Sequence, residues 1–239
     1  MTRYEYGDDP AQFGELTLPA GTPRATVVII HGGFWRSGYD LSLGRPLAVD
    51  LAARGYAAWN LEYRRMGNGG GWPATFDDIA AGIDVLADLP VDTSSVIGLG
   101  HSAGGHLAVW AAGRGAARVR LTGVVSQAGV LGLIDAAHRN LSDGAAQSLM
   151  GGSPADRADQ YAAADPMAAI PLAVPVVCVH ARADANVPFA QSAAYVSAAR
   201  EAGADARLVE AGGDHFSVID PGSSDWQLVV DALDSVVER

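Results

Sequence analysis

Short apolar runs, rich in Val and Ile, alternate along this chain with Ala-rich segments of helical character. The runs are continuously apolar, which is typical of parallel strands buried on both faces of a sheet. Strands separated by helices imply right-handed crossovers and a doubly wound arrangement. The sequence therefore predicts an α/β fold with a mostly parallel sheet, whose strands we expect over Thr26–Ile30, Tyr56–Leu61, Val96–Leu99, Leu121–Gln127, Val174–Val179 and Ala206–Glu210.

Helices are expected between these strands, and glycines mark where two of them end. Gly55 and Gly203 each follow a helical segment directly, at a position where glycine commonly closes a helix. A further strand over Phe13–Leu18 is compatible with antiparallel pairing at one edge of the sheet. The predicted helices span Leu47–Arg54, Asp77–Leu89, Gly104–Gly113, Phe189–Ala202 and Ser224–Val237.

One segment, about residues 131–171, breaks this alternation. It is rich in Ala, Asp and Ser and contains no strand-like run. We interpret it as a small helical insertion that lies over the C-terminal edge of the sheet as a cap or lid. A chain of 239 residues is compatible with one large α/β unit, so residues 1–239 are predicted to form a single domain.

The net charge of −11 argues against two classes of partner. Nucleic-acid phosphates are bound by clustered Lys and Arg, and this chain contains no lysine. The same charge disfavours an anionic membrane surface. No apolar run approaches the ~18 residues of a membrane span, and the N-terminal residues lack the apolar core of a signal peptide. We expect a cytoplasmic protein without nucleic-acid or membrane partners, for which a homodimer is left open.

Residues 100–104 read Gly-His-Ser-Ala-Gly and match the pattern G-x-S-x-G between a predicted strand and a predicted helix. This is the context of a nucleophile elbow, a tight turn that exposes the serine at the sheet edge. The flanking glycines suit such a turn, and the helix N-terminus behind Ser102 favours developing negative charge. The pattern also arises by chance in Gly-rich chains, but its position favours Ser102 as a nucleophile.

An acid and a histidine should follow the serine in that order. Asp184 comes just after the strand Val174–Val179, and His215 lies in a Gly-rich loop after the last strand. A serine hydroxyl needs a base to take its proton as it attacks, and His215 is suited to that role. Asp184 would orient the imidazole and stabilise the imidazolium.

Other residues compete for the roles of acid and base. Asp214 and Asp220 are alternative acids, and His180, at the end of the strand that precedes Asp184, is expected to be structural. Only His215 follows the last predicted strand, which favours it over the remaining histidines, His31, His101, His106 and His138.

Residues 31–35 read His-Gly-Gly-Phe-Trp and follow the first buried strand. Acyl transfer needs two backbone N–H donors aimed at the carbonyl oxygen as it gains charge. One donor is expected from Ala103, and the other from Gly33 or Phe34, where glycines let the backbone approach closely. His31 is expected to brace this loop. An ordinary Gly-Gly turn is the alternative.

These motifs together resemble the α/β-hydrolase superfamily over nearly the whole chain. Within it, residues 31–35 are similar to the H-G-G-x-W motif of serine-type kynurenine formamidases and related carboxylesterases. The segments 100–107 and 214–216, with 219–221, are also similar to that group, as is the pair Tyr63-Arg64. The resemblance implies hydrolysis of a carboxylic ester or of a small aryl amide such as N-formylkynurenine, through an acyl-enzyme and without a metal or cofactor.

Ligands bind beyond the carboxyl ends of the strands in open α/β sheets, and several aromatic residues follow predicted strands. These aromatics would hold an aryl or acyl group of a small-molecule ester or amide, although packing in the core or cap is an equal alternative for each. The residues expected to bind substrate are Gly32, Trp35, Tyr63, Trp72, Phe189 and Phe216.

Other chemistries are less well supported by the sequence. No metal-ligand spacing or dinucleotide motif is present, and the single cysteine, Cys178, is expected to be a buried strand residue. Two further functional classes stay open. One is a ligand-binding member of the fold that does not catalyse, and the other is an acyltransferase or lyase that uses the same three residues, because fold does not determine reaction.

Overall fold

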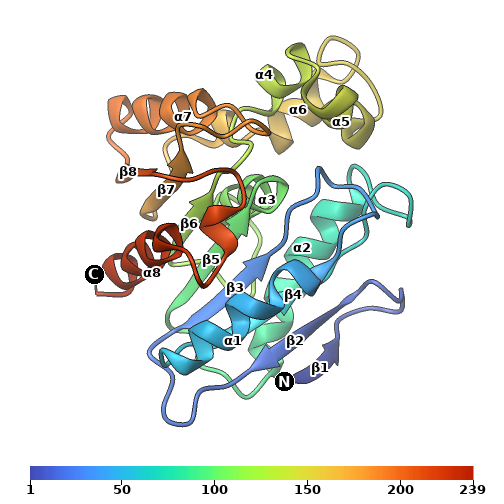
Figure 1. The fold of residues 1–239 in the computed structure, drawn as a ribbon. Helices are drawn as coiled ribbons and strands as arrows, with labels where there is room; N and C mark the ends of the chain where they lie inside the picture. The colour runs from blue at the N-terminus through green and yellow to red at the C-terminus, as the bar shows by residue number, and fades with distance from the viewer. Residues whose placement is uncertain (239) are drawn as a thin grey trace.

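A computed structural model describes residues 1–238 as one eight-stranded sheet in the order β1-β2-β4-β3-β5-β6-β7-β8 (Figure 1). β1 and β2 are antiparallel to their neighbours, and every later pairing is parallel. The doubly wound, mostly parallel sheet expected from the sequence is therefore confirmed. The strands are β1 (Thr2–Glu5), β2 (Phe13–Thr17), β3 (Thr26–Ile30), β4 (Ala57–Leu61), β5 (Val96–His101), β6 (Gly123–Gln127), β7 (Val176–Ala181) and β8 (Ala206–Ala211).

Helices cover both faces of the sheet and bury two separate cores. Successive residues of β3 point to opposite faces, so Val27 packs in one core and Val28 in the other. Helices α1 and α8 cover the first core, and α2, α3 and α7 cover the second (Figure 1). These helices are α1 (Arg45–Ala53), α2 (Ala74–Asp84), α3 (Ala103–Ala112), α7 (Ala190–Glu201) and α8 (Ser224–Val237).

Differences from the expected elements are small, and they lie at the ends. β1 was not expected, because its four residues are mostly exposed and polar and show no apolar run. α2 starts and ends earlier than Asp77–Leu89, and a 3₁₀ helix, η2 (Val85–Asp88), continues it. The edge strand expected over Phe13–Leu18 forms as β2 and pairs antiparallel with β4.

The segment 131–171 is helical, and Figure 1 shows it beyond the carboxyl ends of the strands. The Asp165 carboxylate accepts hydrogen bonds from the backbone N–H groups of Leu133 and Ile134, which ties its two ends together. Gln191 of α7 accepts a hydrogen bond from Gly132 N–H at 2.6 Å. The segment consists of α4 (Leu133–His138), α5 (Leu141–Met150), α6 (Ala158–Ala164) and η3 (Pro166–Ala169).

No helix within residues 1–238 is both long enough and apolar enough to cross a membrane.

Candidate active site

Ser102 lies in the tight turn between β5 and α3, with φ 55° and ψ −117°. A Cβ at Gly100 would lie 2.1 Å from the Gly104 carbonyl oxygen, and a Cβ at Gly104 would lie 1.9 Å from the Ile30 carbonyl oxygen. Only glycine fits at either position. A non-glycine residue at such a backbone conformation costs about 1–3 kcal/mol, and it persists only where the surroundings hold it.

Neighbouring backbone groups hold this strained turn. The Ser102 N–H donates to the Gln127 carbonyl at 2.8 Å, which links the turn to the end of β6. The Ser102 carbonyl accepts from the N–H groups of His106 and Val130, each at 3.2 Å. The turn is thus hydrogen-bonded on both sides, and α3 begins at the next residue, Ala103.

Asp184 and His215 are brought together from the loops after β7 and β8. The His215 Nδ1 atom lies 2.6 Å from Asp184 Oδ2. Asp184 Oδ1 accepts from the N–H groups of Asn186 and Val187, each at 2.8 Å. Burial by itself would raise the pKa of the Asp184 carboxyl, but the hydrogen bonds from two histidines and from the backbone outweigh burial and hold this pKa well below its usual range. The group is therefore an anion at neutral pH.

His101 links the histidine loop to the serine turn. Its Nε2 lies 2.9 Å from the His215 carbonyl oxygen, and the centroids of the two rings are 4.6 Å apart. Burial, followed by repulsion from His215, lowers the pKa of His101 to about 3. The ring is neutral at pH 7, and its Nε2 donates to the carbonyl because that atom is an acceptor only. His101 directly precedes Ser102, so this hydrogen bond holds the His215 backbone beside the turn.

The two alternative acids have local roles. Asp214 Oδ1 accepts from the backbone N–H groups of Phe216 and Ser217, and Asp220 Oδ1 accepts from Gly222 N–H. Both carboxylates stabilise turns, whereas the Asp184 carboxylate contacts the His215 ring.

Asp225, which sequence analysis did not single out, secures the loop that carries His215. Its carboxylate accepts from the N–H groups of Gly212 and Gly213 at 3.0 and 2.8 Å, and from Ser217 Oγ at 2.6 Å. Asp225 lies in the first turn of α8, where acidic residues often bind free backbone N–H groups. Its position in that turn was the one available signal.

The loop 31–35 packs directly against the serine turn. A Cβ at Gly32 would lie 3.0 Å from the Ser102 Cβ. Three successive residues have positive φ: Gly33 at 110°, Phe34 at 49° and Trp35 at 56°. Two of these are not glycine, so the loop is strained and requires anchoring.

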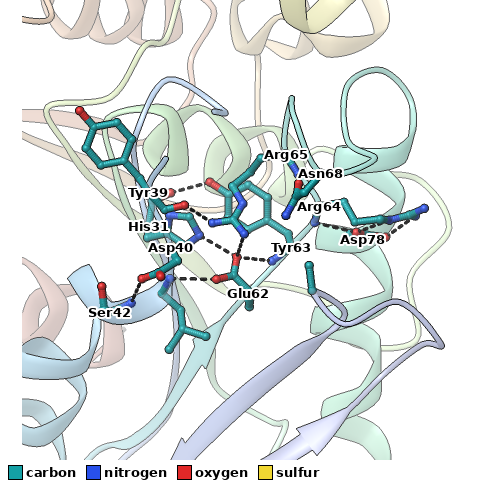
Figure 2. Close-up of polar contacts among 12 residues, drawn as sticks. His31, Tyr39, Asp40, Ser42, Glu62, Tyr63, Arg64, Arg65, Asn68 and Asp78 are labelled. Carbon is teal, nitrogen blue, oxygen red and sulfur yellow. Dashed lines mark hydrogen bonds and ion pairs between the residues drawn. The ribbon is translucent and has the colours of Figure 1, made fainter. Parts of the chain in front are cut away.

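Figure 2 shows the buried carboxylate of Glu62 in contact with His31, at the start of the loop, and with Tyr63 and Arg65. Glu62 Oε1 lies 3.1 Å from His31 Nε2, at the start of the loop, and accepts from Tyr63 N–H at 2.8 Å. Its Oε2 accepts from Leu41 N–H at 3.0 Å, beyond the other end of the loop. Arg65 balances the charge, with Nη2 3.1 Å from Oε1. The backbone N–H groups of Leu41 and Tyr63, together with the Arg65 guanidinium, satisfy a buried charge that would otherwise be costly.

His31 and Tyr63 complete this support from behind the loop. The Tyr63 hydroxyl donates to the His31 carbonyl at 2.7 Å, and the two rings stack with centroids 4.5 Å apart. His31 lies where a bracing residue was expected. Glu62 was not predicted from the sequence, because its contacts with His31 and Leu41 join residues far apart in the chain.

The aromatic residues expected to bind substrate occupy different environments. Trp35 and Tyr63 have 1% and 0% of their surface exposed, so their side chains support the loop from the core and do not face solvent. Trp72 is partly buried against Phe76, with ring centroids 4.9 Å apart. Phe216 is 52% exposed, and its ring lies 5.2 Å from the His215 ring.

A cavity of about 300 Å³ lies between the segment 33–39, Ser142 of the helical segment 131–171 and the loop after Asp184. The cavity is lined by Gly33, Phe34, Arg36, Tyr39, Ser142, Ala185 and Asn186.

Phe189, the remaining aromatic residue that was expected to bind substrate, is half-buried, and its ring lies 5.6 Å from that of His180.

Within residues 1–238, no group of three or more His, Cys, Asp or Glu side chains is placed to hold a metal ion.

Several solved structures to which this chain is similar are esterases. Esterase B from Lactobacillus rhamnosis is 25% identical, with a TM-score of 0.82 over 100% of this chain and 85% of that chain. The thermophilic esterase Est2 from Thermogutta terrifontis is 22% identical, with a TM-score of 0.77 over 98% of this chain and 90% of that chain. Structures of Est2 with propionate and with butyrate bound are similar too.

A larger protein contains a similar fold as one part. The bifunctional GH43-CE protein of Bacteroides eggerthii is 23% identical, with a TM-score of 0.79 over 97% of this chain. The present chain spans only 38% of that protein's length. No curated protein sequence matches the chain.

The BD-FAE family matches residues 15–198, which include Ser102, Asp184 and the loop 31–35. His215 lies beyond the matched segment. The match covers most of the chain, and together with the esterase folds it supports an esterase-like hydrolase. The chain therefore belongs to the BD-FAE family, an esterase family of the α/β-hydrolase type.

Proposed function

We propose that this protein hydrolyses carboxylic esters through an acyl-enzyme, with Ser102 as nucleophile, His215 as general base and Asp184 as the acid that orients the histidine. The observation that carries the proposal is the 2.6 Å contact between His215 Nδ1 and Asp184 Oδ2. Because that carboxylate is an acceptor only, His215 Nδ1 carries the proton and Nε2 is left with a free lone pair. A histidine in this tautomer can take a proton from a serine hydroxyl.

The proposed reaction has two halves. Ser102 Oγ attacks the ester carbonyl carbon while His215 Nε2 takes the hydroxyl proton. The negative charge that develops on the carbonyl oxygen is stabilised by the N–H of Ala103 and by that of Gly33 or Phe34. The tetrahedral intermediate expels the alcohol, which His215 protonates. Water, activated by His215, then releases the acid from Ser102.

The cavity beside the strained loop favours a small acyl group. Its volume of about 300 Å³ lies at the lower end of ligand-pocket sizes. Est2 has been solved with propionate and butyrate, and Esterase B with a tributyrin phosphonate inhibitor. We therefore propose short-chain esters as substrates.

The first test compares the purified protein with its Ser102→Ala variant on p-nitrophenyl acetate, p-nitrophenyl butyrate and N-formylkynurenine. We expect hydrolysis of at least one ester and a loss of about 10³-fold or more in the variant, the scale for a missing nucleophile. Thermal unfolding of both proteins controls for folding. Equal rates in both proteins would exclude Ser102 as the nucleophile.

The same panel separates the narrower alternatives. Preference for N-formylkynurenine over both esters would favour a formamidase, as the H-G-G-x-W resemblance implies. An inactive wild type that is labelled at Ser102 by a fluorophosphonate would indicate a reactive serine with another substrate. An inactive wild type that is not labelled would favour a protein that binds without catalysing, and acyl transfer to an added alcohol would favour an acyltransferase.

A further inference from the structure

A second histidine contacts the oxygen of Asp184 that faces His215. His180 lies in β7, and its Nε2 is 3.1 Å from Asp184 Oδ2. That same oxygen lies 2.6 Å from His215 Nδ1. The His180 side chain has 0% of its surface exposed, so it meets neither solvent nor substrate directly. Its contacts therefore act through Asp184.

Hydrogen-bond partners determine which nitrogen of His180 carries the proton. Nε2 also lies 3.0 Å from the Val187 carbonyl oxygen, so both of its neighbours are acceptors and Nε2 must donate. Nδ1 lies 2.8 Å from the Ser192 hydroxyl. In a neutral ring Nδ1 has a lone pair, and it accepts the Ser192 proton.

Ser192 is fully buried in α7, so its hydroxyl has no competing contact with solvent. The neighbouring thiol, Cys178, is buried too, and burial raises its pKa to about 12, so it adds no charge beside Ser192 at neutral pH. The donors that matter here run from Ser192 to His180 and from His180 to Asp184.

We propose that His180 is a positioning residue for the Asp184–His215 pair, with Ser192 fixing its tautomer. This proposal rests on the proposed function. The donor from His180 and the two backbone donors on Oδ1 prevent the carboxylate from rotating, so Oδ2 stays directed at His215 Nδ1. The same donor also shares the negative charge of Oδ2, which moderates how strongly Asp184 stabilises the imidazolium.

Other charged and titratable groups surround His180 from the packed elements. His215 and His101 lie on the far side of Asp184. Arg182 lies over the Phe189 ring, 4.5 Å from its centroid, and that ring packs against His180. Cys178 lies behind Ser192. All of these groups are present in each variant below, so they do not account for a difference between the variants.

The test is a matched pair of substitutions. In His180→Gln, the side-chain amide can place an N–H near the position of Nε2 and donate to Asp184. His180→Leu has similar bulk and no donor. We expect His180→Leu to lower kcat on p-nitrophenyl butyrate by about 10–100-fold, by analogy with the loss of a hydrogen-bond partner that orients a metal-ligating side chain. KM stays within about twofold, because His180 does not face the cavity. His180→Gln recovers most of the lost kcat.

The pH profile of kcat/KM separates a positioning role of His180 from a packing role, because a loss of packing alone would not shift the profile. Without the His180 donor, Asp184 stabilises the imidazolium of His215 more strongly. The acidic limb of the kcat/KM profile should therefore move to higher pH in His180→Leu. In His180→Gln, which keeps a donor, the limb should stay near its wild-type position. Ser192→Ala removes the donor that fixes the tautomer while it leaves His180 in place. It should move the limb in the same direction by a smaller amount.

Two results would overturn the proposal. One is a His180→Leu protein with the kcat and pH profile of the wild type. The other is an equal loss in His180→Leu and His180→Gln with no movement of the acidic limb, which would indicate packing only. If His180→Leu does not fold, the pH profile of Ser192→Ala becomes the test. An acidic limb of that profile at the wild-type pH would then overturn the proposal. Failure of the proposed function is distinguishable, because Ser102→Ala would then keep the wild-type rate.

Discussion

Gly32 and Ser102 are packed so closely that a Cβ on Gly32 would lie 3.0 Å from the Ser102 Cβ and 2.9 Å from the His101 carbonyl oxygen. The strained loop and the serine turn are therefore in direct contact. In Gly32→Ala, the loop must move away from the turn, and its N–H donors move with it. Misplacement by about 1 Å can cost about 10² in rate, so we expect kcat on p-nitrophenyl butyrate to fall by about 10–100-fold.

Gly38→Ala is the matched control for this substitution. A Cβ at Gly38 meets nothing within 4 Å, and the residue is exposed a few positions further along the same segment. We expect wild-type kcat for Gly38→Ala. Wild-type kcat in Gly32→Ala would show that the loop does not supply the proposed oxyanion donors.

Glu62→Gln tests the anchor of the same loop. The substitution keeps the shape of the side chain but removes the charge that Arg65 and His31 share, and it leaves a buried guanidinium without its counter-ion. Breaking a buried ion pair from one side costs about 3–5 kcal/mol. We therefore expect a lower free energy of unfolding in urea and a reduced kcat.

An exposed ion pair provides the comparison for Glu62. Asp88 and Arg118 are each 58% exposed, and water screens such pairs strongly. Asp88→Asn should leave both the free energy of unfolding and kcat unchanged within error. If Glu62→Gln behaved in the same way, the buried network would not hold the loop.

His106 makes folding stability depend on pH. Burial lowers the pKa of its imidazole to about 4. Because the ordinary value in an unfolded chain is about 6.5, the unfolded state takes up a proton at a higher pH than the folded state does. The stabilisation is thus complete above about pH 6.5 and is lost as the pH falls towards 4, by at most about 1.4 kcal/mol per pH unit.

Urea unfolding at pH 7.0, 5.5 and 4.5 measures this dependence. His106→Gln removes the titrating group, so the loss of stability between pH 7.0 and 4.5 should be smaller than in the wild type. His138, which is exposed, is the control, and His138→Gln should keep the wild-type slope. Parallel slopes for all three proteins would contradict the assignment of a low pKa to His106.

Arg36 connects the end of the strained loop to the helical segment 131–171, called the cap below. It donates through Nη1 to Ser142 Oγ at 3.0 Å and through Nη2 to the Ser142 carbonyl. Ser142 lies in a stretch with positive φ at Asn140, Ser142 and Asp143, which is costly without external support. In Arg36→Ala we expect faster amide hydrogen exchange over residues 140–144 and a KM raised several-fold.

Arg139→Ala is the control within the cap, because Arg139 forms an exposed pair with Asp135. It should leave exchange over residues 140–144 unchanged. Unchanged exchange in Arg36→Ala would mean that residues 140–144 hold their conformation without the contact from Arg36.

Local patterns in the sequence predicted the order of the main strands and helices from β2 onwards, except for the separate helices within 131–171. Apolar runs and glycines report burial and turns within a few residues, so the turn at Ser102 and the loops of Asp184 and His215 could all be located. Buried polar pairs are different, because they join residues far apart. The contact between Glu62 and His31 leaves no periodic signal.

The aromatic residues also show what local sequence patterns cannot predict. Trp35 and Phe34 are neighbours after the same strand, and nothing in their spacing separates a core side chain from a pocket side chain. Both residues have positive φ, and in this conformation Trp35 is buried in the core while Phe34 lines the cavity. Backbone conformations of this kind arise from packing against β4 and the serine turn, which come later in the chain.

The proposed triad takes its three residues from the loops after β5, β7 and β8. It is complete only when the last two parallel strands have paired with the rest of the sheet. Parallel pairing joins distant parts of a chain and forms slowly compared with helices. During refolding, we therefore expect the far-ultraviolet circular dichroism signal of the helices to recover before ester hydrolysis does. The recovery of ester hydrolysis would therefore report when pairing of the sheet is complete.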